Sequence, residues 1–178
     1  MKTISCVLVS AGFLLASGCT TIHEAARQGD LARVQKPVRA GTPVESRGPM
    51  KATPLFDAAR GGHVDVAGFL LAKGADVNFR NERGGSPLHA AACKGQPAMV
   101  EFLIARGAKV NARANNGQTP LHKAANVKDR KDNSPGPGHL AAAKVLLKHV
   151  AGPHAKDKSG KSPLDLAGTE EMKALLRK

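Results

Sequence analysis

The sequence predicts an all-α solenoid built from about four to five helix-turn-helix units. A Thr/Ser-Pro-Leu opening begins at Thr53, Ser86 and Thr119, at steps of 33 residues. Each opening combines a helix-capping hydroxyl with a proline, and each is followed by a second apolar stretch. One such unit cannot bury its apolar face alone, whereas stacked copies can, so the period predicts an array of repeats.

The unit that begins at Ser86 illustrates why each repeat should form two helices. The Ser86 hydroxyl can cap free backbone N–H groups, and Pro87 suits the first helical position, where its missing N–H costs nothing. We therefore expect a first helix over about Pro87–Lys94, ended by Gly95 in the left-handed conformation. A second helix should follow, with an apolar face formed by Met99, Val100, Phe102, Leu103 and Ile104.

The opening Thr119-Pro120-Leu121-His122, which is followed by alanines, resembles the Thr-Pro-Leu-His-x-Ala opening of the ankyrin repeat. Several residue types recur at fixed offsets over most of the chain, so the resemblance does not depend on one short motif. It implies an ankyrin-repeat solenoid in which turn tips and first helices line a concave groove that binds protein partners. It also implies that His89 and His122 form hydrogen bonds within their turns.

The offsets divide the predicted array into units of unequal regularity. The first unit has Thr21 where proline is expected and Pro37 where later units have leucine, which predicts a degenerate N-terminal cap. The fourth unit contains a charged, Pro/Gly-rich insert that predicts a loop, and its Val150 replaces a capping glycine, which predicts an irregular helix end. The predicted units are 20–52, 53–85, 86–118, 119–161 with the insert 128–137, and a C-terminal cap 162–178.

Residues 1–18 are predicted to form a leader, which leaves 19–178 as the repeat domain. The apolar run Ile4–Ser17 is too short to span a bilayer. Small residues before Cys19 resemble the lipobox of bacterial lipoproteins, although Ala16 stands where that family has leucine. The resemblance implies an acylated Cys19 that anchors the chain, at the outer membrane more than the inner. The alternative is an ordinary secretory leader that leaves Cys19 free.

Basic residues clearly exceed acidic ones, with 27 Lys and Arg against 14 Asp and Glu. The excess could serve a groove for an acidic protein, attraction to an anionic membrane surface, or only a solvated basic surface. No nucleic-acid partner is expected, because export would separate the chain from nucleic acid and the sequence has no Trp or Tyr on which bases could stack.

The candidate partner-binding residues occupy variable turn positions and the edge of the first helices. Glu82 is the only acid in this set, so the set favours an acidic protein partner with arginines as anchors. Arg27 occupies the corresponding helix position in the first unit. The candidates are Arg60, Arg80, Glu82, Arg83, Lys94, Arg113, Asn115, Gln118, Lys123, Lys156, Lys158 and Lys161.

No catalytic, metal or cofactor site is predicted. The histidines of the repeats fall either in the Thr-Pro-Leu-His opening or, like His63 and His139, after a glycine that precedes the second helix. Metal-binding spacings such as Cys-x-x-Cys are missing, and no Ser/His/Asp set stands out. Cys93 admits two interpretations, which are packing within the array and an exposed redox thiol.

The sequence therefore predicts a monomeric, non-catalytic protein-binding scaffold that is lipid-anchored in the bacterial cell envelope. Since a fold does not fix a function, this prediction depends on the family resemblance. Two alternatives stay open: a periplasmic immunity or inhibitor protein against an acidic toxin or enzyme, and, by a further resemblance, an accessory protein of a haem enzyme such as catalase. A redox role through Cys93 is the rival of another class.

Overall fold

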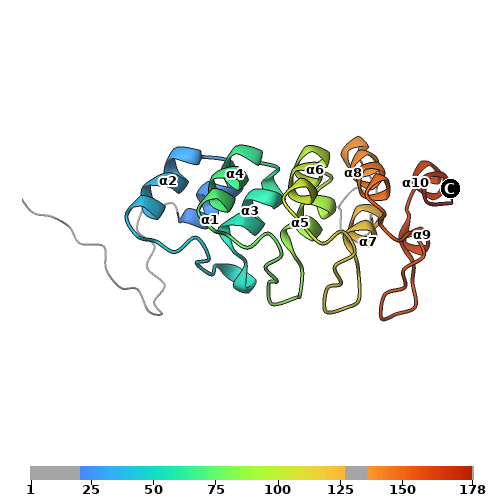
Figure 1. The fold of residues 1–178 in the computed structure, drawn as a ribbon. Helices are drawn as coiled ribbons and strands as arrows, with labels where there is room; N and C mark the ends of the chain where they lie inside the picture. Colours follow the sequence, from blue (N-terminus) through green and yellow to red (C-terminus); the bar gives the residue numbers. More distant parts are fainter. Residues whose placement is uncertain (1–20, 127–135, 178) are drawn as a thin grey trace, which may run out of the picture.

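The computed structural model describes residues 21–126 and 136–177. Within these ranges ten α-helices and one 3-10 helix form two stacked rows, and the turns project to one side (Figure 1). The described part is therefore the predicted all-α solenoid. The inner row, next to the turns, contains α1 (Ile22–Gln28), α3 (Pro54–Gly61), α5 (Pro87–Cys93), α7 (Pro120–Ala125) and α9 (Pro163–Leu166). The outer row contains α2 (Leu31–Arg39), α4 (Val64–Ala72), α6 (Pro97–Ala105), α8 (Pro137–Lys148) and α10 (Glu170–Leu176), and η1 (Pro49–Lys51) precedes α3.

The inner helices from α3 onward begin at the capped openings that the sequence predicts. Thr53 Oγ accepts a hydrogen bond from the backbone N–H of Phe56 (3.3 Å) at the start of α3. The helix expected over Pro87–Lys94 is α5, which ends one residue earlier, and Gly95 follows in the left-handed conformation with a φ of 63°. A side chain at Gly95 would collide with the ring of His139, so both the backbone and the available space require glycine.

The first helix begins one residue later than the alignment predicts. Its cap is Thr21, whose Oγ accepts from the backbone N–H of Glu24 (3.3 Å), whereas the alignment placed the cap at Thr20, outside the described residues. Thr21 can take this role because no proline stands there. α2 continues through Pro37, although a proline inside a helix costs about 3 kcal/mol. Packing against α1 and α4 therefore holds α2 in shape.

Small side chains on the inner helices let neighbouring units approach closely, while larger side chains of the outer helices fill the space beside them. Full burial of a leucine or methionine contributes roughly 1.5–3 kcal/mol, so the stability of the array comes from stacking. The fully buried inner pairs are Ala25 and Ala26, Ala58 and Ala59, Ala91 and Ala92, and Ala124 and Ala125. The fully buried outer side chains include Val34, Leu70, Leu103, Leu146 and Met172.

Asparagines at the same position of successive units join the turns to one another. Nδ2 of Asn78 donates to the Gly107 carbonyl oxygen (3.0 Å), and its Oδ1 accepts from the backbone N–H of Lys109 (2.9 Å). Asn111 makes the corresponding pair of hydrogen bonds to the next unit, at 3.0 and 2.9 Å. The turns therefore form one connected edge of the array.

A second set of hydrogen bonds ties outer helices to the inner helices of preceding units. Nε2 of His63 lies 2.9 Å from the Arg27 carbonyl oxygen, and Nε2 of His139 lies 3.0 Å from the Cys93 carbonyl oxygen. Since a carbonyl only accepts, each Nε2–H is the donor. The shared contact confirms the alignment of His139 with His63.

The insert predicted at 128–137 lies mostly outside the described residues, which resume at residue 136. Its last residue, Pro137, was expected in a loop, but it is the first residue of α8. Proline suits this position because its fixed φ is already helical and its missing N–H has no helical partner to lose. α8 therefore starts before His139, whereas α4 starts after the corresponding His63.

The prediction that α8 ends irregularly is wrong, because Val150 adopts the conformation that glycine has in other units. Its φ is 64°, compared with 90° at Gly74 and 86° at Gly107. The backbone N–H of Val150 donates to the Leu147 carbonyl oxygen (3.1 Å), which repeats the bond that Gly107 makes at the end of α6. The hydrogen bonding is thus regular, and the cost lies in a branched side chain held in the left-handed region, which amounts to about 1–2 kcal/mol.

We predict that Val150→Gly stabilises the array by about 1 kcal/mol, because glycine removes the left-handed strain but is more flexible in the unfolded chain. No apolar burial is lost, since Val150 is 81% exposed. Urea unfolding of the two proteins measures the difference. Val150→Ala is the control and should recover only part of the gain, because alanine keeps its Cβ. Equal stability of the wild type and Val150→Gly would show that this residue is not strained.

Candidate functional site

The turn tips and inner helices enclose a hollow of about 610 Å³, which is within the size range of binding pockets. Its walls come from η1, from α3, α5 and α7, and from the two turns that follow α4 and α6. We call this hollow the groove. It is lined by Met50, Phe56, Arg60, Asn81, Glu82, Arg83, Gly85, His89, Ala90, Cys93, Lys94, Ala114, Asn115, Asn116, Lys123 and Asn126.

Two repeat positions of the inner helices supply much of the groove floor, and their residues change along the array. Acids stand at the first position in the first two units only, and a small residue and then a base follow. The first position holds Glu24, Asp57, Ala90 and Lys123 in successive units. The second position holds Arg27, Arg60, Cys93 and Asn126.

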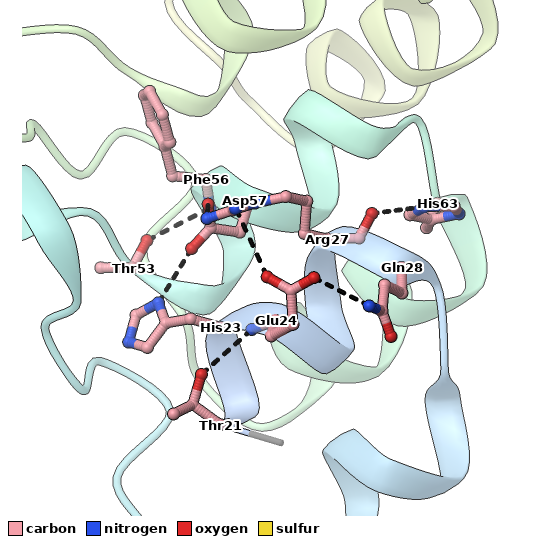
Figure 2. A network of polar contacts seen from close by, with 9 residues as sticks. All are labelled: Thr21, His23, Glu24, Arg27, Gln28, Thr53, Phe56, Asp57 and His63. Atoms are coloured by element: carbon pink, nitrogen blue, oxygen red, sulfur yellow. Dashed lines mark hydrogen bonds and ion pairs between the residues drawn. The ribbon is translucent and has the colours of Figure 1, made fainter. Parts of the chain in front are cut away.

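The acids of the first two units both pair with side chains of the first unit (Figure 2). Asp57 is buried, with one carboxylate oxygen 2.9 Å from Nδ1 of His23 and the other 3.3 Å from Nη2 of Arg27. Nη1 of Arg27 lies 3.4 Å from a Glu24 oxygen, and Nε2 of Gln28 donates to the other (2.8 Å). The two carboxylates therefore do not neutralise the cations of the groove.

Six of the predicted partner-binding residues line the groove, and they come from three successive units. Four of them are cations, and Glu82 is the only acid among the described residues that line it. Nδ2 of Asn115 donates to the Glu82 carbonyl oxygen (2.9 Å), which fixes one turn against the next. The six are Arg60, Glu82, Arg83, Lys94, Asn115 and Lys123.

Other predicted residues hold the turns together. Nη2 of Arg80 donates to the Arg113 carbonyl oxygen, and Nη1 of Arg113 donates to the Lys156 carbonyl oxygen, both at 2.7 Å. The two arginines line a separate hollow of about 130 Å³. Gln118 was expected in the binding surface, but it is buried and its Nε2 donates to Asp157 (3.3 Å). We therefore assign Gln118 to the packing between turns.

The remaining candidates lie away from the groove. Lys156, Lys158 and Lys161 belong to the last turn and line neither hollow. The Lys161 carbonyl oxygen accepts from Nε2 of His122 (3.1 Å), so the backbone of this turn is tied to α7. These lysines extend the basic surface without forming part of the hollow.

Met50 and Phe56 also line the groove, although neither is among the predicted partner-binding residues. Phe56 carried a usable signal, because it replaces the histidine that the openings have at His89 and His122. Met50 carried none, since its segment does not match the repeat. It is 40% exposed, and both Met50 and Lys51 have left-handed backbones, with φ values of 55° and 54°.

The predicted leader 1–18 and the predicted lipid-attachment residue Cys19 lie outside the described residues. Within 21–126 and 136–177, no three His, Cys, Asp or Glu side chains are arranged to hold a metal ion. None of the described helices, of which α8 with 12 residues is the longest, could cross a bilayer.

Comparison with known families agrees with this architecture. A family model of ankyrin repeats in three copies matches residues 22–114 and 73–133, and a model of the single ankyrin repeat matches residues 116–158. The chain is an ankyrin-repeat protein. Among curated proteins, no match to it is found. Ankyrin-repeat proteins are generally non-catalytic scaffolds for protein–protein interaction, which agrees with the predicted class of function.

The ankyrin histidines at the openings are locked in one neutral form. The backbone N–H of Ser86 donates to Nδ1 of His89 (3.2 Å), so Nδ1 must accept, and Nε2–H donates to the Gln118 carbonyl oxygen (3.1 Å). His122 has the same arrangement. The pKa of His89 is lowered from 6.5 to about 4, chiefly by burial and to a smaller extent by the charge of Lys123. Burial also lowers the pKa of His122.

We predict that the ankyrin array loses stability as the pH falls from 6.5 to about 4. His89 binds a proton over this range in the unfolded chain but not in the folded chain, so stability falls, and His89 contributes about 3 kcal/mol to the loss. Urea unfolding at a series of pH values measures the slope. His89→Phe should reduce it, and the exposed His154→Gln should not. Phenylalanine already occupies this position at Phe56. Unchanged slopes in both variants would contradict the assignment.

Proposed function

We propose that this chain is a protein-binding scaffold whose groove takes an acidic protein partner, and that Cys19 anchors it to a membrane of the bacterial envelope. The distribution of charge in the groove is the main support for an acidic partner. One hollow is lined by four cations, which are Arg60, Arg83, Lys94 and Lys123. The carboxylate of Asp57, on the inner helix α3, is already paired with His23 and Arg27.

Several properties support a protein partner in this groove. It spans three units, and its cations come from both helices and turns, so an extended chain could contact several of them at once. Arginine is among the residues that most often dominate binding energy at interfaces. Complementary charge raises association rates and excludes partners of like charge.

We predict that reversing three groove cations, with Arg60→Glu, Arg83→Glu and Lys94→Glu combined, abolishes crosslinking of the partner in cells. The reversed charges repel an acidic surface, and like-charge contacts cost several kcal/mol. Arg80 and Arg113 are left intact because they fasten the turns. Crosslinking, detergent extraction and mass spectrometry identify what is bound.

The matched control reverses three basic residues of the outer row, Lys36, Arg39 and Lys73, which changes the net charge equally. This control should crosslink like the wild type. Equal loss in both variants would indicate a general charge effect, and loss in neither would refute the groove. The identity of the crosslinked protein also separates a scaffold from an immunity protein and from an accessory protein of a haem enzyme.

The membrane anchor is supported by the sequence before the array. An apolar run ends in small residues and Cys19, and α1 begins at Ile22 with almost no linker between them. Two or three acyl chains bind a bilayer stably, since each buried methylene contributes roughly 0.8 kcal/mol. An array held this close to the surface would bring its basic residues near anionic lipid, where each contributes about 1 kcal/mol.

We predict that the protein incorporates a labelled fatty acid when it is expressed in bacteria, and that Cys19→Ser abolishes the label because the thiol and the cleavage site are lost. Mass spectrometry of the N-terminal peptide measures the acyl mass. Cys93→Ser is the control and should keep the label. A mature protein that carries a free Cys19 thiol would refute the anchor and favour an ordinary secretory leader.

A further inference from the structure

Apolar side chains line the groove together with the cations. Phe56 of α3, Ala90 and Cys93 of α5, and Met50 of η1 line the same hollow as the cations. Phe56 and Cys93 are half-buried, and Met50 is 40% exposed. The hollow thus combines apolar side chains with positive charge.

Phe56 departs from the repeat at a position that also lines the groove as His89 in the next unit. At the same position of later units, His89 and His122 are buried, and their rings bond the capping residue and the next turn. A phenyl ring can make neither bond, although the capping threonine Thr53 is still present in this unit. The substitution gives up hydrogen bonds and places an aromatic surface in the groove.

Met50 is held at the edge of the same hollow by a strained turn. Met50 and Lys51 are consecutive non-glycine residues in the left-handed region, a combination that costs about 1–2 kcal/mol for each residue. The Met50 carbonyl oxygen accepts from the backbone N–H of Glu82 (3.0 Å), which fixes the strained turn to the next one. Strain that persists in this way is typical of functional sites.

We propose that the partner binds through an acidic segment whose central residue is a large apolar side chain, and that Met50, Phe56, Ala90 and Cys93 form the pocket for that side chain. The proposal rests on the function proposed above and names what the groove selects. Carboxylates on both sides of the apolar residue contact Arg60, Arg83, Lys94 and Lys123. Charge brings the segment to the groove, and the apolar pocket distinguishes it from other acidic chains.

The test uses two fluorescein-labelled peptides, each with four glutamates on both sides of a central residue, which is leucine in one and glycine in the other. Fluorescence anisotropy measures their affinities for the full protein. We expect the leucine peptide to bind at least about tenfold more tightly, because full burial of a leucine is worth roughly ten- to a hundredfold in affinity. Equal affinities would overturn the proposal.

Two variants locate the pocket. Phe56→His restores the residue that the repeat has at His89 and His122, so this variant should fold, which circular dichroism checks. Met50→Ser has a matched control in Val150→Ser, because Met50 and Val150 are both exposed apolar residues with left-handed backbones. In Phe56→His and in Met50→Ser, the ratio of the leucine-peptide affinity to the glycine-peptide affinity should fall close to one. In Val150→Ser this ratio should stay as in the wild type. An unchanged ratio in the first two variants would overturn the pocket.

A charge-reversed protein, Arg60→Glu with Lys94→Glu, separates this inference from the proposed function. Both peptides should bind it at least about tenfold more weakly, because two attractive contacts become repulsive. If neither peptide weakens, or if a leucine peptide with glutamines in place of glutamates binds equally well, the acidic partner itself is refuted. If both weaken but leucine and glycine never differ in the wild type, only the apolar pocket is refuted.

Discussion

Close contact between successive inner helices is the constraint on which the array depends. An alanine pair recurs in each of the first four units, and every one of these alanines has no exposed surface. Interiors of this density tolerate little extra volume, so a larger side chain here would separate two units. The contact fixes the register of neighbouring units, and that register lets Asn78, Arg80, Asn111 and Arg113 reach backbone groups of the next turn.

The same register determines which side chains meet in the groove. Residues one repeat apart lie at equivalent places of adjacent helices, so Arg27 of the first unit can reach Asp57 of the second. Arg27 and His23 therefore pair with Asp57, which lies in the same helix as Arg60. The cationic character of the groove thus depends on a charge arrangement at the N-terminal end of the array as well as on the groove residues themselves.

Much of the fold could be predicted from the sequence, because the signals are local and recur. A hydroxyl before a proline fixes the start of α3, α5 and α7, and a glycine in the left-handed conformation follows α3 at Gly62 and α5 at Gly95. Val150 shows the limit of that reasoning. Its sequence predicts an irregular end, but the hydrogen bonds to neighbouring turns impose the regular conformation on an unsuitable side chain.

The candidate site was less predictable, because side chains in turns are directed by the neighbouring turn. By their positions in the turns, Arg80, Arg83, Asn115 and Gln118 were all predicted to bind the partner. The structure separates them, since Arg80 bonds the next turn and Gln118 is buried against Asp157. The predicted lipid attachment at Cys19 stays a prediction, since this residue lies outside the described ones.

A departure from the repeat that lowers stability indicates a binding role only when the departing side chain lies in the groove. Val150 is strained, but its side chain points into solvent and meets nothing in the groove. Phe56 gives up the hydrogen bonds of a buried histidine, and Met50 holds a strained backbone, yet both side chains line one hollow. Two independent costs that converge on the same apolar surface, beside four cations, are what a binding site for a mixed apolar and acidic segment would require.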